Sequence, residues 1–225
     1  MTLQDAERAP RQSGWSLVVK SAADRAFAAA ALLVMAPVLL AVALAVRVSM
    51  GSPVLFAQER PGRQARPFRI YKFRTMRDAR GANGKALPDG ERLTPVGRVL
   101  RASSADELPQ LWNVLRGELS LVGPRPLLRQ YVDRYTPEQA RRHEVLPGIT
   151  GWAQVNGRNA IDWGEKLALD VWYVDHWSLR LDAKILAMTV WRVITWHGVS
   201  REGHATMPEF TGNERGRSKE HQENP

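Results

Sequence analysis

The sequence predicts an α/β fold that is mostly helical with a few short strands, and three observations support this class. An uncharged apolar run precedes a long polar region, several segments of that region begin with helix-capping residues, and short apolar segments lie between Gly and Pro breaks. A chain of 225 residues is long enough for one sizeable core. We therefore expect a disordered lead at 1–19, an apolar helix bent at Pro37 at 20–50, the main domain at 51–200 and a disordered tail at 201–225.

The composition restricts the partners and the chemistry of the protein. The chain carries 32 Lys and Arg against 23 Asp and Glu, which gives a net charge of +9. This excess suits anionic lipid head groups, nucleic acid or phosphorylated substrates, and charge alone does not choose among them. The absence of cysteine excludes disulfides, thiolate metal sites and a cysteine nucleophile.

The apolar run is long enough to cross a bilayer. Residues 26–46 carry no charge and lie between Arg25 and Arg47, and as a helix they would form a rod of about 30 Å. Pro37, at the middle, removes a backbone hydrogen bond and clashes with the preceding turn, so the helix should bend there. Basic residues flank both ends of the run. Length and charge leave two alternatives open, a spanning helix that tolerates the proline and a hairpin that enters and leaves by one face.

Short strands and a capped helix are predicted after this run. Residues 54–57 and 68–73 have the character of short extended segments, and the Gly-rich stretch 78–93 should be a flexible loop. Thr94, followed by a proline, is typical of an N-cap and predicts a short helix that ends near Arg101.

The stretch 103–127 combines two adjacent carboxylates with a stiffened turn. Ser104 and Glu107 have the Ser-x-x-Glu spacing of a capping box, which predicts a helix that ends at Gly117. Its apolar face, core or membrane-facing, would consist of Leu108, Leu111, Trp112 and Leu115. Asp106 would then lie in the first helical turn, where free N–H groups favour an ionised carboxylate that can bind a hard cation or attack phosphorus.

The turn that follows holds a cation. Residues 119–122 should form a short strand, and prolines on both sides of Arg125 restrict the backbone that carries its guanidinium. Further on, Thr136 should cap another helix, and two helices are expected between 163 and 196, divided near residue 177. Residues 153–159, which group amides and an arginine around a glycine, have the composition of a polar loop.

Several blocks, in this order, carry a resemblance to a known family. They are Lys20 with Asp24 and Pro37, Gln58-Glu59-Arg60, Lys72-Phe73-Arg74-Thr75-Met76, Asp106-Glu107-Leu108-Pro109-Gln110, Ser120-Leu121-Val122-Gly123-Pro124-Arg125-Pro126, Pro147-Gly148-Ile149-Thr150-Gly151-Trp152 and Trp172-Tyr173-Val174. With these blocks the chain resembles the bacterial sugar transferases, also called monotopic phosphoglycosyl transferases, from about residue 20 to residue 195.

The resemblance implies a reaction, a metal and a location. Members transfer a sugar-1-phosphate from a nucleotide diphosphate sugar, usually a UDP-sugar, to undecaprenyl phosphate with Mg2+, and they release UMP. This is the first membrane step in the assembly of exopolysaccharide, O-antigen or glycoconjugate. The Pro37 helix of the family is a re-entrant hairpin, so the resemblance favours the second alternative above. It also implies a catalytic domain on the cytosolic face of the bacterial inner membrane.

The resemblance also assigns roles to single residues. Asp106 corresponds to the nucleophile, which forms a covalent phosphosugar intermediate, and to a metal ligand, while Glu107 corresponds to its partner. The basic residues that would bind the substrate phosphates are Lys72, Arg74, Arg101 and Arg125. Residues that would contact the nucleotide sugar are Gln154, Asn156 and Arg158.

A second hypothesis comes from a different class of protein. A non-catalytic, membrane-tethered basic module that binds anionic lipid or nucleic acid would explain the net charge and the apolar run. It gives no reason for the grouping of Asp106 and Glu107 with Arg125. We therefore expect an enzyme without a nucleic-acid partner, and the sequence leaves open whether it is a homo-oligomer.

Overall fold

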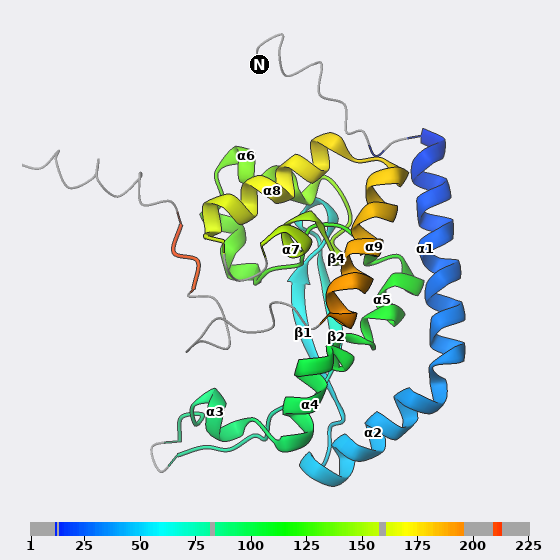
Figure 1. Ribbon diagram of the computed structural model, residues 1–225. Coiled ribbons are helices and arrows are strands. Elements are labelled where there is room, and N and C mark those ends of the chain that lie inside the picture. Colours follow the sequence, from blue (N-terminus) through cyan, green and yellow to red (C-terminus); the bar gives the residue numbers. More distant parts are fainter. Residues whose placement is uncertain (1–11, 13, 82–83, 158–160, 196–208, 213–225) are drawn as a thin grey trace, which may run out of the picture. The chain divides into compact units, whose positions relative to one another are not determined.

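The computed structural model describes residues 12, 14–81, 84–157, 161–195 and 209–212. Within these residues the chain is mostly helical with short strands (Figure 1), as the sequence predicts. It divides into two compact units. The first unit comprises Met1–Lys20, Arg60–Phe68 and Ser120–Pro225, and the second comprises Ser21–Glu59 and Arg69–Leu119.

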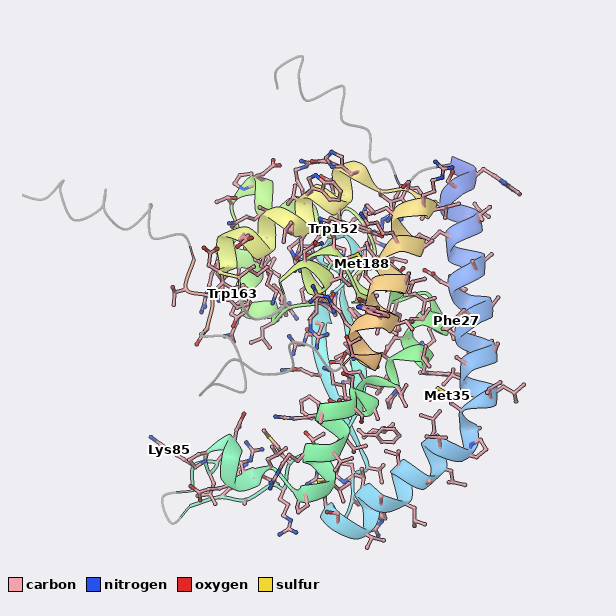
Figure 2. The ribbon with its side chains drawn as sticks, viewed as in Figure 1. Phe27, Met35, Lys85, Trp152, Trp163 and Met188 are labelled. Carbon is pink, nitrogen blue, oxygen red and sulfur yellow. The ribbon has the colours of Figure 1, made fainter. Side chains whose placement is uncertain are left out.

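The chain begins with a bent pair of helices, α1 (Gly14–Val34) and α2 (Ala36–Met50), with a bend of 65°. Among the described residues no single helix is long and apolar enough to cross a membrane, but this pair passes that test of length and composition together, as a broken span or a re-entrant loop. Met35 lies at the junction (Figure 2), and Pro37 is the second residue of α2. Since proline has no N–H, the Leu33 carbonyl lacks its helical donor at the bend.

The predicted disordered lead through residue 19 is wrong for residues 14–19, because α1 begins at Gly14. Distant contacts hold this start in place. The Lys20 ammonium forms a buried 2.6 Å ion pair with Asp182, and Gln12 donates a 3.5 Å hydrogen bond to the Tyr173 hydroxyl. Such partners, far away in sequence, leave no local signal that could have predicted the helix.

The second unit has a small apolar core at the end of its second strand. Strands β1 (Leu55–Pro61) and β2 (Pro67–Phe73) form a two-stranded sheet. Phe73 at the end of β2 is buried with Val46 of α2 and Leu100 of α4 (Pro95–Ser103). Helices α2 and α4 pack against each other. The predicted loop 78–93 contains a short helix, α3 (Asp89–Arg92).

Thr94 caps α4 as the sequence predicts, since its hydroxyl accepts a 2.9 Å hydrogen bond from the Gly97 N–H. The Ser104–Glu107 capping box is wrong. Ser104 has a φ of 58° and makes no side-chain cap. A 3-10 turn, η2 (Ala105–Glu107), follows it, and α5 (Gln110–Arg116) begins only after Pro109.

Helix α5 ends at Gly117, whose φ of 76° is the left-handed conformation that favours glycine, as predicted. Its buried face consists of Gln110, Leu111, Asn113 and Val114. Trp112, which the sequence places on the apolar face, is 49% exposed.

The first unit is built on two short parallel strands. β3 (Ser120–Val122) pairs with β4 (Gly148–Thr150), in the register Ser120 to Gly148 and Val122 to Thr150. The backbone approaches very closely at the first residue of β4, since a Cβ on Gly148 would lie 2.1 Å from the nitrogen of Gly123, which follows β3. Only glycine fits at such a distance.

Helices cover these strands (Figure 1). The two predicted C-terminal helices are present as α8 (Trp163–His176) and α9 (Leu179–Ile194), with the division where it was expected. Thr136 forms the predicted cap, a complete capping box, on α6 (Pro137–Ala140). The remaining helical segments are η1 (Arg63–Ala65), η3 (Arg129–Arg134), η4 (Arg141–His143) and α7 (Trp152–Asn156).

The predicted disordered tail is wrong for residues 209–212. Phe210 is only 2% exposed and packs against Tyr131 of η3 and Trp163 of α8. Arg134 donates to the Phe210 carbonyl and forms a 3.0 Å ion pair with Glu209. The polar composition of the tail gave no sign that Phe210 would be buried. Residues 201–208 and 213–225 lie outside the described residues.

Candidate active site

The second unit joins a lysine of β2 to the acidic pair on η2. Lys72 Nζ lies 2.5 Å from Glu107 Oε1, and both side chains are largely buried. Asp106 precedes Glu107 on the same 3-10 turn and is half-buried. The pairing fixes the direction of the Glu107 carboxylate and keeps a cation beside the acidic pair.

A buried asparagine ties α5 to β2 and so positions this group. Asn113 has no exposed surface, and its amide oxygen accepts a 3.3 Å hydrogen bond from the Tyr71 N–H. Its amide nitrogen donates to the Arg69 carbonyl at 2.7 Å and to Glu118 at 2.8 Å. Because Tyr71 adjoins Lys72 in β2, these bonds fix the position of the lysine backbone relative to α5.

Arg101 lies at the end of α4 and points to the segment after β2. Its Nε donates a 3.0 Å hydrogen bond to Thr75 Oγ1. The helix approaches this segment closely, since a Cβ on Gly97 would lie 1.9 Å from the Thr75 carbonyl oxygen. Arg74 is held differently, because it donates to the carbonyls of Pro53 at 3.1 Å and Met76 at 3.4 Å.

The carboxylates of this site fit one type of metal site. Among the described residues no group of three or more His, Asp or Glu side chains is arranged to hold a metal ion. Mg2+, however, is commonly bound by one or two protein carboxylates together with substrate phosphates. Asp106 and Glu107 supply such a pair, so their chemistry is compatible with Mg2+ that arrives with a diphosphate.

In the first unit, Arg125 lies in a turn whose backbone is fixed from two sides. The Gly148 N–H donates to the Pro124 carbonyl at 3.0 Å, and Arg142 Nη2 donates to the Arg125 carbonyl at 2.7 Å. Arg142 is itself buried at 2% exposure and paired with Asp170. The turn is therefore stiffer than its two prolines alone would make it.

The predicted polar loop at 153–159 is wrong for residues 153–156, which belong to the helix α7. Gln154 donates to the Ile149 carbonyl and Asn156 to the Trp152 carbonyl, both at 2.8 Å, so each amide nitrogen is bound to nearby backbone. Gln154 Oε1 is buried and, among the described residues, has no hydrogen-bond partner. Arg158 lies outside the described residues.

Sequence reasoning missed a group of buried charged residues, which consists of Arg142, Lys166 and Asp170. Lys166 and Asp170 are four residues apart on α8, and this spacing could have predicted that both side chains lie on the same face of the helix. The burial of Arg142 had no such signal, because it depends on the packing of η4 against α8.

Comparison with known proteins identifies the chain as similar to sugar transferases of bacteria. The family described as "Bacterial sugar transferase" matches residues 15–196. A Bacillus subtilis (strain 168) protein named "Uncharacterized sugar transferase EpsL" is 60% identical over 167 residues, which are 74% of this chain and 83% of that protein.

Two longer relatives have more specific names. The "UDP-glucose:undecaprenyl-phosphate glucose-1-phosphate transferase" of Escherichia coli (strain K12) is 41% identical over 80% of this chain and 41% of its own length. The "UDP-N-acetylgalactosamine-undecaprenyl-phosphate N-acetylgalactosaminephosphotransferase" of Aeromonas hydrophila is 39% identical over 80% of this chain. The match covers 44% of the latter protein, so this chain spans less than half of each.

Proposed function

Because this chain belongs to the bacterial sugar transferase family, we propose that it is a phosphoglycosyl transferase that moves a sugar-1-phosphate from a UDP-sugar to undecaprenyl phosphate and releases UMP. The names of the Escherichia coli and Aeromonas hydrophila relatives support this donor and acceptor. The observation that carries the proposal is the acidic pair on η2, with Lys72 2.5 Å from Glu107.

The proposed chemistry has two steps. In the first, a carboxylate oxygen of Asp106 attacks the phosphorus attached to the sugar, an Asp106 O–P bond forms, and the phosphoanhydride bond breaks so that UMP leaves with its electron pair. In the second, an oxygen of undecaprenyl phosphate attacks the same phosphorus and releases the Asp106 carboxylate. Water must be kept away between the steps, which favours a site at the membrane surface.

Charge neutralisation is the main demand of these steps. Within the second unit, Lys72, Arg74 and Arg101 are the proposed ligands of the phosphates. Within the first unit, Arg125 is the residue proposed to contact a phosphate. Asp106 and Glu107 are the residues that would hold Mg2+. When bound, the ion would reduce the charge on the diphosphate and the developing charge on the leaving group.

The α1–α2 pair is the proposed anchor, as a re-entrant hairpin that places the protein on the cytosolic face of the bacterial inner membrane. The 65° bend supports this arrangement, because a helix that turns within the bilayer can return to the side from which it entered. An active site at the membrane surface would meet an acceptor phosphate at the depth of the lipid head groups.

The test is a substitution of the nucleophile. Asp106→Asn removes the attacking charge at nearly constant volume and should reduce UMP release from a UDP-sugar by about a thousand-fold or more. Asp78→Asn is the matched control, since Asp78 is an exposed carboxylate of the same unit that lies 3.7 Å from Arg80. It should leave the rate unchanged.

Two outcomes would contradict the proposal. Retained turnover in Asp106→Asn would exclude the covalent route through this residue. A wild-type protein that binds anionic liposomes but forms no product from any UDP-sugar would favour the non-catalytic basic module instead.

A further inference from the structure

One buried carboxylate of the first unit accepts hydrogen bonds from distant parts of the chain. Asp182 lies in the first turn of α9 and is 6% exposed. Its Oδ2 accepts from the Lys20 ammonium of α1 at 2.6 Å and from Trp177 Nε1 at 3.1 Å. Its Oδ1 accepts from the Tyr173 hydroxyl of α8 at 2.7 Å. We refer to Lys20, Tyr173, Trp177 and Asp182 as the Asp182 network.

The Asp182 network is closed to water on every side. Lys20 is 4% exposed, Tyr173 1% and Trp177 6%. A buried ion pair adds little net stability, because removing both charges from water costs about as much as their attraction returns. Such a pair can instead specify one arrangement of the segments that carry it, since separating them leaves a buried charge without its counter-charge. The network therefore selects one position for the start of α1.

Lys20 connects the Asp182 network to the apolar run. It lies on the continuous helix α1, six residues before the uncharged residues 26–46 begin. At the rise of an α-helix, this is about 9 Å along the helix axis. The start of α1 lies beside the start of α9 (Figure 1), where the ion pair forms. The pair thus holds α1 to the first unit just before the proposed membrane segment.

Tyr173 connects the same network to the turn that carries Arg125. Its hydroxyl lies 3.1 Å from the Val122 carbonyl oxygen, and its single proton can be donated there or to Asp182. Val122 is the last residue of β3, and Arg125 follows three residues later. A short path of buried contacts therefore joins the helix that leads to the membrane with the Arg125 turn.

We propose that Asp182 is a positioning residue of this transferase, which holds α1 through Lys20 and so keeps the Arg125 turn at one depth relative to the lipid bilayer. The inference rests on the proposed function, with the α1–α2 pair as the anchor and Arg125 as a phosphate ligand. The phosphate of a polyprenyl acceptor is confined to the head-group layer, so a site whose depth varies meets it less often in a reactive geometry. The UDP-sugar arrives from solution, and its binding does not depend on that depth.

The experiment uses the full chain as wild type, Asp182→Asn and the double variant Lys20→Met/Asp182→Asn. Asparagine keeps an acceptor for Tyr173 and Trp177 and removes only the charge that holds Lys20. The double variant leaves no unpaired buried charge, so it should fold even if Asp182→Asn does not.

Asp175→Asn is the matched control. Asp175 is a carboxylate of the same unit, on the same helix as Tyr173, and its ion-pair partner is Arg141 of η4 instead of a residue of α1. Its loss removes an ion pair from the first unit without touching the Asp182 network.

The first readout is the KM of each substrate in lipid nanodiscs and in detergent micelles. In nanodiscs both Asp182 variants should raise the KM of undecaprenyl phosphate about ten-fold and leave that of the UDP-sugar near the wild-type value. In micelles the acceptor is not held at a fixed depth, so both KM values should stay close to those of the wild type. A purely structural role would not produce this difference between the two environments. Asp175→Asn should resemble the wild type in both.

The second readout needs no turnover. Spin labels on Val18→Cys, exposed on α1, and Glu165→Cys, exposed on α8, report the distance between these helices in nanodiscs. The wild type and Asp175→Asn should give one narrow distance distribution, and both Asp182 variants a broader one. This arm stays informative if the wild type releases no UMP, a result that would count against the proposed function.

Three results would overturn the inference. They are an unchanged KM of undecaprenyl phosphate in nanodiscs, an equal rise of that KM in nanodiscs and micelles, and a double variant whose distance distribution is as narrow as that of the wild type.

Discussion

At the scale of single residues, the ion pair between Lys72 and Glu107 joins two residues that lie 35 positions apart. Asn113 supports it, since its amide bonds to the backbone of Tyr71 and Arg69 hold β2 against α5. Each buried hydrogen bond of this kind contributes about 1 kcal/mol, and leaving its partner unsatisfied costs more. The geometry of the acidic site therefore depends on a residue that has no part in the proposed chemistry.

His143 makes the stability of the first unit depend on pH. Burial, together with the charge of Arg142, lowers its pKa to about 4, although its Nδ1 is 3.2 Å from the Gly62 carbonyl. The folded state therefore holds a neutral imidazole, while the unfolded chain takes up a proton near its ordinary pKa of about 6.5. The stability contributed by the neutral ring is present above that pH and is lost as the pH falls toward the folded pKa.

We expect the free energy of unfolding to fall by about 2 kcal/mol more in the wild type than in His143→Gln between about pH 7 and about pH 5. Glutamine keeps a donor for the Gly62 carbonyl and does not titrate. Denaturant unfolding at several pH values measures the difference. Parallel pH dependences in the two proteins would show that His143 is not the titrating group.

At the scale of elements, the bend between α1 and α2 decides how the anchor meets a membrane. Pro37 interrupts the hydrogen-bond ladder at the bend, and the two helices together have the length and apolar composition of a membrane segment. Pro37→Leu restores the missing N–H and should straighten the pair, so that in a fraction of molecules residue 1 moves to the opposite side of the membrane.

Because the chain contains no cysteine, a single introduced cysteine can report this topology without background labelling. A single cysteine introduced by Thr2→Cys, or by Pro225→Cys as the control, is probed in sealed vesicles with a membrane-impermeant maleimide. In the protein that keeps Pro37, both positions should lie on the cytosolic side of the membrane. The Pro37→Leu substitution should change only the labelling of position 2. Labelling of position 2 from the periplasmic side in the Pro37 protein would exclude the hairpin.

At the scale of the whole molecule, a short segment beyond α9, residues 209–212, packs against the rest of the first unit. Phe210 fills a site among Tyr131, Tyr135 and Trp163. Phe210→Ala should lower the free energy of unfolding of the first unit by about 3 kcal/mol, the usual cost of emptying an aromatic site in a core. Glu209→Gln, which weakens an exposed ion pair with Arg134 and an exposed hydrogen bond from Gln130, should cost less than about 1 kcal/mol.

Hydrogen exchange of α8 and η3 measures the effect of both substitutions. Faster exchange in Phe210→Ala, with little change in Glu209→Gln, is the expected result. Equal exchange in the wild type and Phe210→Ala would mean that the docked segment adds nothing to the stability of the first unit.

Much of the fold follows from local signals. Thr94 and Thr136 cap helices where the sequence predicts them, Gly117 ends α5, and the division between α8 and α9 lies near residue 177. Ser104 failed as a cap because the residue adopts a left-handed conformation between two packed helices. The Gly148–Thr150 strand and α7 were missed, since their pairing and packing partners lie elsewhere in the chain.

The sequence by itself determined the fold class, the bent apolar helix, the acidic pair and the family, because caps, prolines, apolar runs and motif blocks act over short spans of chain. Tertiary structure alone decided that Lys72 pairs with Glu107, that Arg142 supports the Arg125 turn, that Lys166 is buried and that Phe210 docks. These outcomes depend on burial and on contacts between residues far apart in sequence. Their energies arise only when the chain has folded, so no local pattern encodes them.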